Sequence, residues 1–330
     1  MKALVYTGPR EVVYRDVADP ALSAGEVVIR IDAAGICGSD MHAYHGHDPR
    51  RVPPMILGHE VAGEIVAGPG AGRRVTVNPL ITCGRCEFCV QGRDNLCANR
   101  SMVGMNRPGA FAQYMSIPTG SLLDLPEDMS TRQAALTEPA ATALHALHLC
   151  MRALERPLPE AKVLVIGGGA VGLLAALLMR AYGSRQVLMA EVNPLRRQAA
   201  ERQTGYRGFD PREHGGPADG TMDLVFDAVG GKDTRRAALA AVKPGGVVMH
   251  VGLQDWVSEI DMRKLTLAEI TLLGTYTYTT ADLRATVQAL YAGAFGDLSW
   301  VEERSLEEGA SAFEDLDRGR LAAAKVLLIP

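Results

Sequence analysis

The stretch Lys162–Gly172, KVLVIGGGAVG, joins two patterns that together predict a fold. Its first five residues form a short continuous apolar run, which is typical of a buried parallel strand. The glycines that follow have the spacing G-x-G-x-x-G and open an Ala/Leu-rich segment that is expected to be helical. Such glycines let the backbone approach a pyrophosphate, and the helix N-terminus presents free N–H groups to it. We therefore predict a dinucleotide site, whose contacts in this turn are Gly167, Gly169, Ala170, Val171 and Gly172.

Beyond this turn the chain continues to alternate strands and helices. Strands are predicted at residues 186–190, 224–226 and 246–251, which indicates a doubly wound parallel sheet. Glu191 ends the second strand, 24 residues after Gly167. A carboxylate there accepts hydrogen bonds from a ribose 2′-OH and repels a 2′-phosphate, so it favours NAD over NADP, although a plain surface acid is the alternative. Arg196 and Arg197 follow closely and weaken that preference.

The N-terminal part has a different sequence pattern. Up to about residue 135, alternating runs such as 27–31 and 74–77 are separated by Gly, Pro and Asp, which predicts a β-rich domain. A helix is expected over Ala134–Leu149, and the end of the chain holds a helix-like segment (281–292) and a strand (325–329) that can return to the first domain. A chain of 330 residues exceeds the usual size of one domain, so two are expected.

Four cysteines, Cys83, Cys86, Cys89 and Cys97, lie close together in the sequence. Thiolates at this spacing form the closed tetrahedral cage of a structural zinc. Disulfides are the alternative, but cysteines at two-residue gaps are poorly placed to cross-link one another. No signal peptide is recognisable in the opening MKALVYTG, so we expect a reducing, cytoplasmic environment in which thiols bind metal.

A second metal site is predicted upstream, around Cys37 and His59. A Cys, a His and one carboxylate leave a coordination position open, which is how a catalytic zinc is held. Glu60 follows His59 directly, and Glu138 begins the predicted helix; either carboxylate is a candidate ligand, and the two can exchange with a water. The sixth thiol, Cys150, has no assigned role and is expected to be buried.

Charge and hydropathy restrict the partners. The chain has 34 basic and 38 acidic residues, a net charge of −4, and no basic stripe, which argues against nucleic acid. The longest apolar run, about residues 170–179, is too short to cross a bilayer. We therefore expect a small-molecule substrate and neither a nucleic-acid nor a membrane partner.

Together these motifs resemble the zinc-dependent medium-chain dehydrogenases, and within them the branch of sorbitol and other polyol dehydrogenases. The resemblance rests on Cys37-Gly38-Ser39-Asp40, Gly58-His59-Glu60, the four-cysteine cluster and the glycine turn, in that order. It implies a GroES-like catalytic domain of residues 1–143 and 277–330 with an inserted Rossmann NAD-binding domain of residues 144–276. It also implies two zinc ions per chain, one catalytic and one structural, and a homodimer or homotetramer.

The implied reaction moves a hydride between NAD and the secondary hydroxyl of a polyol, sugar derivative or related small alcohol. Ser39, two residues after Cys37, is placed to relay the proton, and His42 to continue the path, although Ser39 is alternatively a turn residue. By the same resemblance, Thr142, Val229, Val251 and Gly252 line the nicotinamide pocket. A threonine-type or simple secondary or primary alcohol dehydrogenase is the alternative, with NADP as the alternative cofactor.

The chain departs from sorbitol dehydrogenases at Thr277, where those relatives usually carry an Arg, while Tyr278 preserves part of their pattern. Losing a guanidinium removes a multi-donor clamp and puts sorbitol itself in doubt. Arg50 and Arg51 are expected to be a solvated pair on a loop, with contact to an anionic substrate as the alternative.

Overall fold

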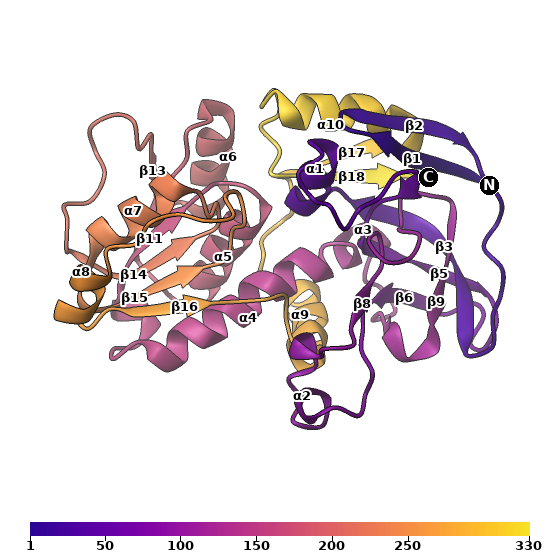
Figure 1. The fold of residues 1–330 in the computed structure, drawn as a ribbon, viewed down its shortest axis with the longest axis horizontal. Coiled ribbons are helices and arrows are strands. Elements are labelled where there is room, and N and C mark those ends of the chain that lie inside the picture. Colours follow the sequence, from indigo (N-terminus) through magenta and orange to yellow (C-terminus); the bar gives the residue numbers. More distant parts are fainter.

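The structure is a computed structural model that describes residues 1–330. A parallel sheet flanked by helices lies beside a β-rich part, and the chain passes between them through α4 (Thr137–Ala153) and again before α9 (Thr280–Tyr291) (Figure 1). None of its helices combines the length and apolar character that crossing a membrane requires. The predicted fold class, a β-rich domain with an inserted Rossmann-type sheet, is confirmed.

The inserted sheet has six parallel strands. Across the sheet they run β13 (Arg207–Phe209), β12 (Gln186–Ala190), β11 (Lys162–Ile166), β14 (Met222–Asp227), β15 (Val242–His250) and β16 (Thr271–Gly274). This order places the first and fourth strands side by side at the centre, where a doubly wound sheet binds its ligand.

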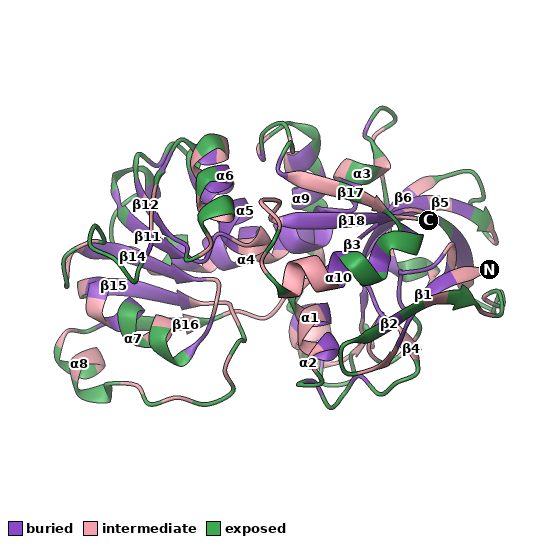
Figure 2. Cartoon of the chain, turned by 90° about the horizontal axis from the view of Figure 1, so that it is seen from above, coloured by how far each residue is buried: buried purple, intermediate pink, exposed green.

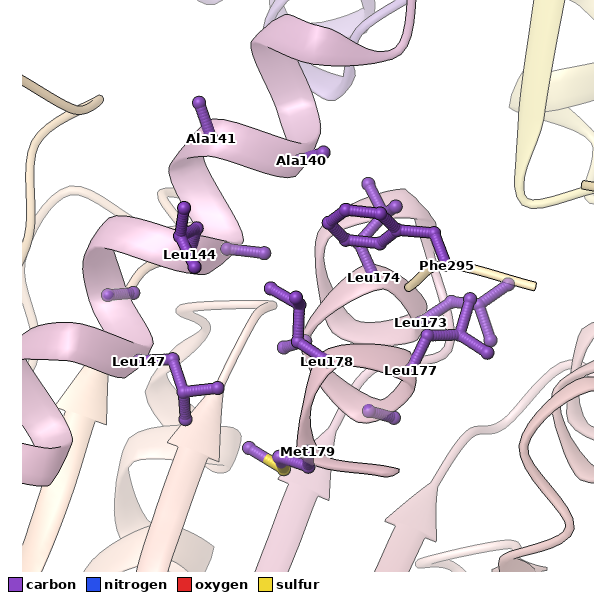
Figure 3. Close-up of a cluster of buried hydrophobic side chains, with 14 of the residues drawn as sticks. Ala140, Ala141, Leu144, Leu147, Leu173, Leu174, Leu177, Leu178, Met179 and Phe295 are labelled. Carbon is purple, nitrogen blue, oxygen red and sulfur yellow. The ribbon is translucent and has the colours of Figure 1, made fainter. Parts of the chain in front are cut away.

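Helices cover both faces of this sheet, because its central strands are apolar on both sides. Val163 and Val165 pack with α4 and α5 (Ala170–Ala181), whereas Leu164 and Ile166 pack with α7 (Lys232–Ala241). Figure 3 shows leucines of α4 and α5 meeting, with Phe295 beside them. Burying each such side chain contributes roughly 1.5–3 kcal/mol.

The β-rich part is built on a seven-stranded sheet that includes the end of the chain. Its path runs β10 (Leu122–Asp124), β6 (Arg74–Val77), β5 (Glu60–Ala67), β3 (Glu26–Gly35), β18 (Lys325–Ile329) and β17 (Val301–Ser305), with β9 (Tyr114–Pro118) also on β3. Because β18 pairs antiparallel with the end of β3, the last strand returns to the first domain, beside Cys37. The buried strands of both sheets are visible in Figure 2.

The remaining elements are short. The other strands are β1 (Lys2–Gly8), β2 (Glu11–Asp16), β4 (Met55–Ile56), β7 (Leu80–Ile81) and β8 (Ser101–Met102). The other helices are α1 (Gly38–Tyr44), α2 (Glu87–Val90), α3 (Thr131–Ala134), α6 (Pro194–Thr204), α8 (Met262–Leu267) and α10 (Gly309–Asp317), and the 3-10 turns are Asp94–Leu96, Thr119–Ser121, Leu158–Glu160 and Leu306–Glu308. The predicted boundary at 143/144 lies inside α4, and the one at 276/277 lies between β16 and α9; both boundaries remain predictions.

Candidate metal and cofactor site

The upstream metal site forms where β3 and β5 meet. Gly35 and Glu60 are cross-strand partners, so Cys37, just past the end of β3, comes close to His59, just before β5. One ligand atom each from Cys37, His59 and Glu60 lies within 4.8 Å of the others. A Cβ at Gly35 would lie 2.0 Å from Glu60 Oε2, so the glycine makes room for this carboxylate.

The charges around His59 fit a bound cation. Burial lowers the pKa of His59, but Asp40 and Cys37 outweigh it and raise the pKa well above its ordinary value. Burial raises the pKa of Asp40, yet His59 and Arg51 hold it at about 2. Asp40 Oδ1 lies 3.6 Å from His59 Nδ1, longer than a hydrogen bond but in the place where a metal-binding histidine commonly has a carboxylate. The S, N and O donor set and this demand for positive charge suit zinc.

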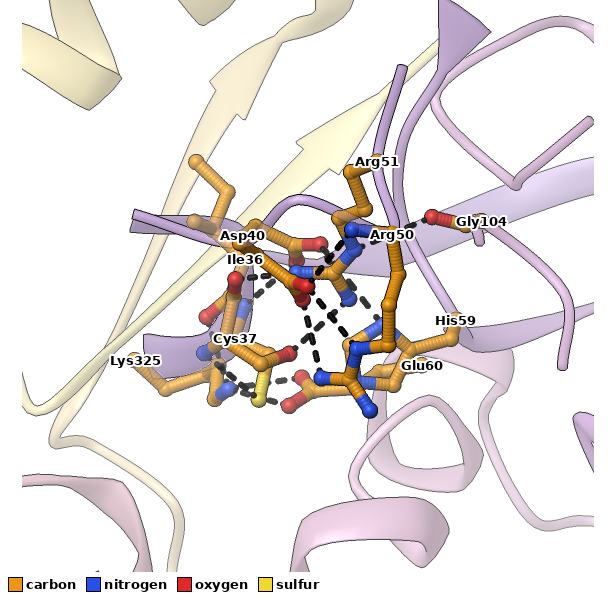
Figure 4. A network of polar contacts seen from close by, with 11 residues as sticks. Ile36, Cys37, Asp40, Arg50, Arg51, His59, Glu60, Gly104 and Lys325 are labelled. Carbon is orange, nitrogen blue, oxygen red and sulfur yellow. Dashed lines mark hydrogen bonds and ion pairs between the residues drawn. The ribbon is translucent and has the colours of Figure 1, made fainter. Parts of the chain in front are cut away.

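Glu60 has a partner that the sequence did not suggest. Lys325 Nζ lies 2.6 Å from both Glu60 oxygens and donates to the Ile36 carbonyl oxygen at 2.8 Å (Figure 4). Burial lowers the pKa of Lys325, but Glu60 and Cys37 raise it above its usual value. Both side chains are buried, so Glu60 is shared between the cation site and a fixed ammonium.

Glu138 lies outside the 4.8 Å set that Glu60 joins, although it is also buried. Burial raises the pKa of Glu138 to about 7; His59 opposes this rise and Glu60 adds to it. The nearby Tyr278 hydroxyl is buried without a hydrogen-bond partner, and burial and Glu138 raise its pKa. Both carboxylates therefore remain candidate ligands, with different surroundings.

The raised pKa of Glu138 predicts that the free energy of unfolding of the metal-free protein depends on pH. Between about pH 4.5 and 7 the folded state keeps a proton that the unfolded state has lost, so stability falls as pH rises through this window. In chelator-treated protein, Glu138→Gln is expected to raise the unfolding free energy by roughly 2–3 kcal/mol at pH 8 and by less than about 1 kcal/mol at pH 5. Urea unfolding at the two pH values measures this.

Glu127 is exposed and supplies the control, because Glu127→Gln replaces a carboxyl that is in water in both the folded and the unfolded state. An equal gain for Glu138→Gln at both pH values would show that the buried carboxyl does not titrate as described.

The proposed proton path begins at Ser39, whose Oγ accepts a hydrogen bond from Arg51 Nη2 at 3.1 Å. Burial, together with His45, His47 and Arg51, lowers the pKa of His42, which favours the neutral imidazole that accepts a proton. No hydrogen bond joins Ser39 to His42 in the structure, so the order of the relay stays a prediction.

The solvated pair expected at Arg50 and Arg51 is half wrong. Arg50 is largely exposed and bonds only to Asp48, at 2.8 and 2.9 Å. The Arg51 side chain is completely buried, because the buried Asp40 carboxylate requires a countercharge. A sequence pattern of two adjacent arginines on a loop holds no signal that separates them.

The four-cysteine cluster comes together between β7 and β8. Its Sγ–Sγ distances include 3.4 Å (Cys86–Cys89), 3.5 Å (Cys97–Cys83) and 4.0 Å (Cys83–Cys89). Four sulfurs around one zinc at about 2.3 Å would be about 3.8 Å apart, which these distances bracket. Backbone N–H groups of Arg85 and Cys86 lower the pKa of the Cys83 thiol to about 6, which favours the thiolate. The geometry suits a closed structural zinc.

The glycine turn has the tight geometry that its sequence predicts. Gly167 has φ +100°, and a Cβ at Gly172 would lie 2.0 Å from the Gly167 carbonyl oxygen. Gly169 precedes α5, and a Cβ there would meet nothing within 4 Å, which leaves room for a ligand at the helix N-terminus. Ala170 and Val171 form the first turn of α5.

Glu191 lies directly beside this turn. Its Oε2 accepts from the Gly168 N–H and its Oε1 from the Asn193 N–H, both at 2.7 Å. A carboxylate has further lone pairs for a ribose hydroxyl. Arg196 Nη2 lies 3.8 Å from Glu191 Oε1 and Arg196 Nε is buried without a partner, so a cationic group also stands beside this carboxylate.

Three of the remaining predicted cofactor residues are brought to the same edge of the sheet, and the fourth, Thr142, lies on a helix. Val229 follows β14, and Val251 and Gly252 follow β15. A Cβ at Gly230 would lie 1.8 Å from the Gly252 carbonyl oxygen, so these two loops touch. Thr142 lies on α4, with its hydroxyl toward the Glu138 carbonyl oxygen at 3.4 Å.

Comparison with known proteins agrees with this geometry. Residues 23–127 match the alcohol dehydrogenase GroES-like domain, and residues 170–292 match the zinc-binding dehydrogenase domain. The chain is 31% identical to the sorbitol dehydrogenase of Bacillus subtilis, over 100% of this chain and 97% of that protein. It is 33% identical to the L-threonine 3-dehydrogenase of Pectobacterium atrosepticum, over 84% of this chain and 80% of that protein.

A similar solved structure is a putative zinc-binding dehydrogenase from Sinorhizobium meliloti bound to NADP, with a TM-score of 0.86 and 30% identity over 100% of this chain and 99% of that one. The chain belongs to the zinc-dependent medium-chain dehydrogenase family, in its polyol dehydrogenase branch.

Proposed function

We propose that this protein is a zinc-dependent dehydrogenase that transfers hydride between NAD and the secondary hydroxyl of a polyol, sugar derivative or related small alcohol. The observation that carries the proposal is a Cys37–His59–carboxylate centre, with His59 and Glu60 buried, in the same chain as the glycine turn. Cys37, His59 and either Glu60 or Glu138 would hold the catalytic zinc, and the four-cysteine cluster would hold a structural one.

When bound, zinc lowers the pKa of a substrate hydroxyl and NAD accepts the hydride. The chain's own groups handle the proton and the orientation. Ser39 Oγ takes the hydroxyl proton and passes its own proton on, with neutral His42 as the next acceptor. The glycine turn and Glu191 hold the pyrophosphate and ribose, and the touching loops at Val229 and Gly252 support the nicotinamide end.

One group of buried hydroxyls supports a polyhydroxylated substrate. The Oγ1 atoms of Thr275 and Thr277 and the Tyr278 hydroxyl are buried without partners, in the segment where sorbitol dehydrogenases usually place an arginine. Neutral hydroxyls exchange hydrogen bonds with substrate hydroxyls as donors and acceptors, which an arginine does not. The likeness to a threonine dehydrogenase supports the alternative substrate, an amino acid with a secondary hydroxyl.

The test is NADH formation from NAD with polyols, sugar acids, sugar phosphates, threonine and simple alcohols. Preference for polyols supports the proposal; turnover of threonine or simple alcohols alone selects the alternative. No hydride transfer with any of them contradicts the assignment.

For the cofactor we propose NAD, with NADP as the alternative that Arg196 supports. Glu191→Ala is expected to lower kcat/KM for NAD by about 10–100-fold, because a charged hydrogen bond to the ribose contributes about 1.5–3 kcal/mol. The ratio of kcat/KM for NADP to that for NAD should rise in the same variant, since the carboxylate no longer repels a 2′-phosphate.

Arg196→Ala is the opposing variant and should lower the use of NADP. Glu213→Ala removes an exposed acid and serves as the control. An unchanged cofactor ratio in Glu191→Ala would mean that this residue does not contact the ribose.

We also propose that two copies associate through the edge of the parallel sheet. Strand β16 has a neighbour on one side only, and Leu253, Trp256, Val257 and Met262, in the segment that joins β15 to β16, are exposed. An open strand edge with apolar neighbours favours pairing with a second copy. Light scattering at micromolar concentration tests this, and a monomer there would contradict it.

A further inference from the structure

Arg51 occupies an unusual place for an arginine on a loop. Its Nε donates to the Gly104 carbonyl oxygen at 3.2 Å, Nη1 donates to the Ser39 carbonyl oxygen, and Nη2 donates to Ser39 Oγ at 3.1 Å. The same Nη2 lies 3.6 Å from Asp40 Oδ1, which in turn lies 3.6 Å from His59 Nδ1 (Figure 4). One buried guanidinium therefore reaches both the proposed proton relay and the carboxylate behind His59.

The contact to Ser39 fixes the direction of its hydroxyl. A hydroxyl has one proton to donate and two lone pairs, and a guanidinium only donates. With one lone pair occupied by Arg51 Nη2, Ser39 Oγ keeps one lone pair for the substrate hydroxyl, and its own proton must point elsewhere. This is the arrangement that a relay requires, because the group accepts on one side and donates on the other.

We propose that Arg51 is a positioning residue for the proton relay, a role that rests on the proposed dehydrogenase function. It holds Ser39 Oγ so that the substrate hydroxyl proton moves to that oxygen while the serine's own proton leaves to the next acceptor. The hydride, with both electrons of the broken C–H bond, goes to the nicotinamide of NAD, and one proton reaches solvent. Arg51 itself neither gains nor loses a proton or an electron.

The contact to Asp40 keeps the loop in place. Without the guanidinium, the buried Asp40 carboxylate would keep only His59 and the Cys37 N–H as partners, and removing one partner of a buried charge pair is strongly destabilising. A lysine keeps this charge but presents a single compact ammonium, which does not reproduce the fork that spans Ser39 and Gly104. Lysine and methionine at position 51 therefore separate charge compensation from positioning.

The experiment compares Arg51→Lys and Arg51→Met with Arg50→Met in the zinc-loaded protein, using the alcohol that wild type oxidises fastest. Arg50 is the matched control, since it is the adjacent arginine, exposed and bonded only to Asp48. We expect kcat to fall at least about 10-fold in both Arg51 variants, with KM changed less than about threefold. The solvent deuterium isotope effect on kcat should rise, because proton transfer then limits turnover. Arg50→Met should match wild type.

A double-mutant cycle with Ser39→Ala decides whether Arg51 acts through the serine. In the Ser39→Ala background, Arg51→Lys should lower kcat by less than about threefold, because the group that it positions is gone. Independent, multiplicative losses would overturn the proposal. So would an Arg51→Lys variant with wild-type kcat and isotope effect.

A readout without turnover separates this role from loss of the metal. In cobalt-substituted protein, the visible absorption of Arg51→Lys should match wild type, which shows that Cys37 and His59 still hold the ion. A changed spectrum would make Arg51 a support of the metal centre and overturn the relay role. If Arg51→Met fails to fold, Arg51→Lys carries the test. If wild type and Arg50→Met transfer no hydride, the proposed dehydrogenase function fails, and the relay role of Arg51 fails with it. If only the relay role is wrong, wild type and Arg50→Met remain active.

Discussion

Replacing Cys37 by alanine is expected to lower kcat/KM for alcohol oxidation by at least about 10³-fold, because the substrate hydroxyl then lacks the zinc that lowers its pKa. Cys37 Sγ is one of only three ligand atoms gathered within 4.8 Å at this centre. The zinc content measured by mass spectrometry should fall from two ions per chain to one. The circular dichroism spectrum should stay unchanged, since neither sheet depends on this thiol.

Cys150 provides the matched control for this substitution. It is a buried thiol on α4 that belongs to neither metal cluster, and burial raises the pKa of its thiol, which disfavours a thiolate. Cys150→Ala should therefore keep both zinc ions and near-normal turnover. Retained turnover in Cys37→Ala, or a full complement of zinc, would refute the assignment of Cys37 as a ligand of the catalytic metal.

Replacing Cys89 by alanine is expected to lower the thermal stability of the protein more than its turnover rate. Four thiolates form one cage, and three hold zinc far less tightly, so the loop between β7 and β8 loses its cross-link. Loss of a structural metal is among the few single changes that cost about 4 kcal/mol or more. We expect the thermal midpoint to fall on the order of 10 °C, and zinc analysis to show one ion per chain.

Val90→Ala changes an exposed neighbour in the same loop and should leave the midpoint and the metal content as in wild type. Residual turnover at low temperature is expected in Cys89→Ala, because Cys37 and His59 lie at the ends of β3 and β5, in a different sheet from β7 and β8. Two zinc ions per chain in Cys89→Ala would show that the four-cysteine cluster does not act as one cage.

Local spacing was enough to predict the features that span few residues. The structural cage needs four thiols within 15 residues, Cys83–Cys97, and the structure brings them together. The glycine turn needs three glycines after an apolar strand, and β11 and α5 flank it as predicted. In both cases the chain segment itself restricts the geometry, so the sequence carries the signal.

The surroundings of the catalytic centre were decided by tertiary structure. Lys325 meets Glu60 across 265 residues, and only the pairing of β18 with β3 brings them together. Arg51 looks like its solvated neighbour Arg50 in the sequence, yet the buried Asp40 carboxylate draws it inside. The cost of burying an uncompensated charge selects these partners, and which charges are buried is known only once the sheets have packed.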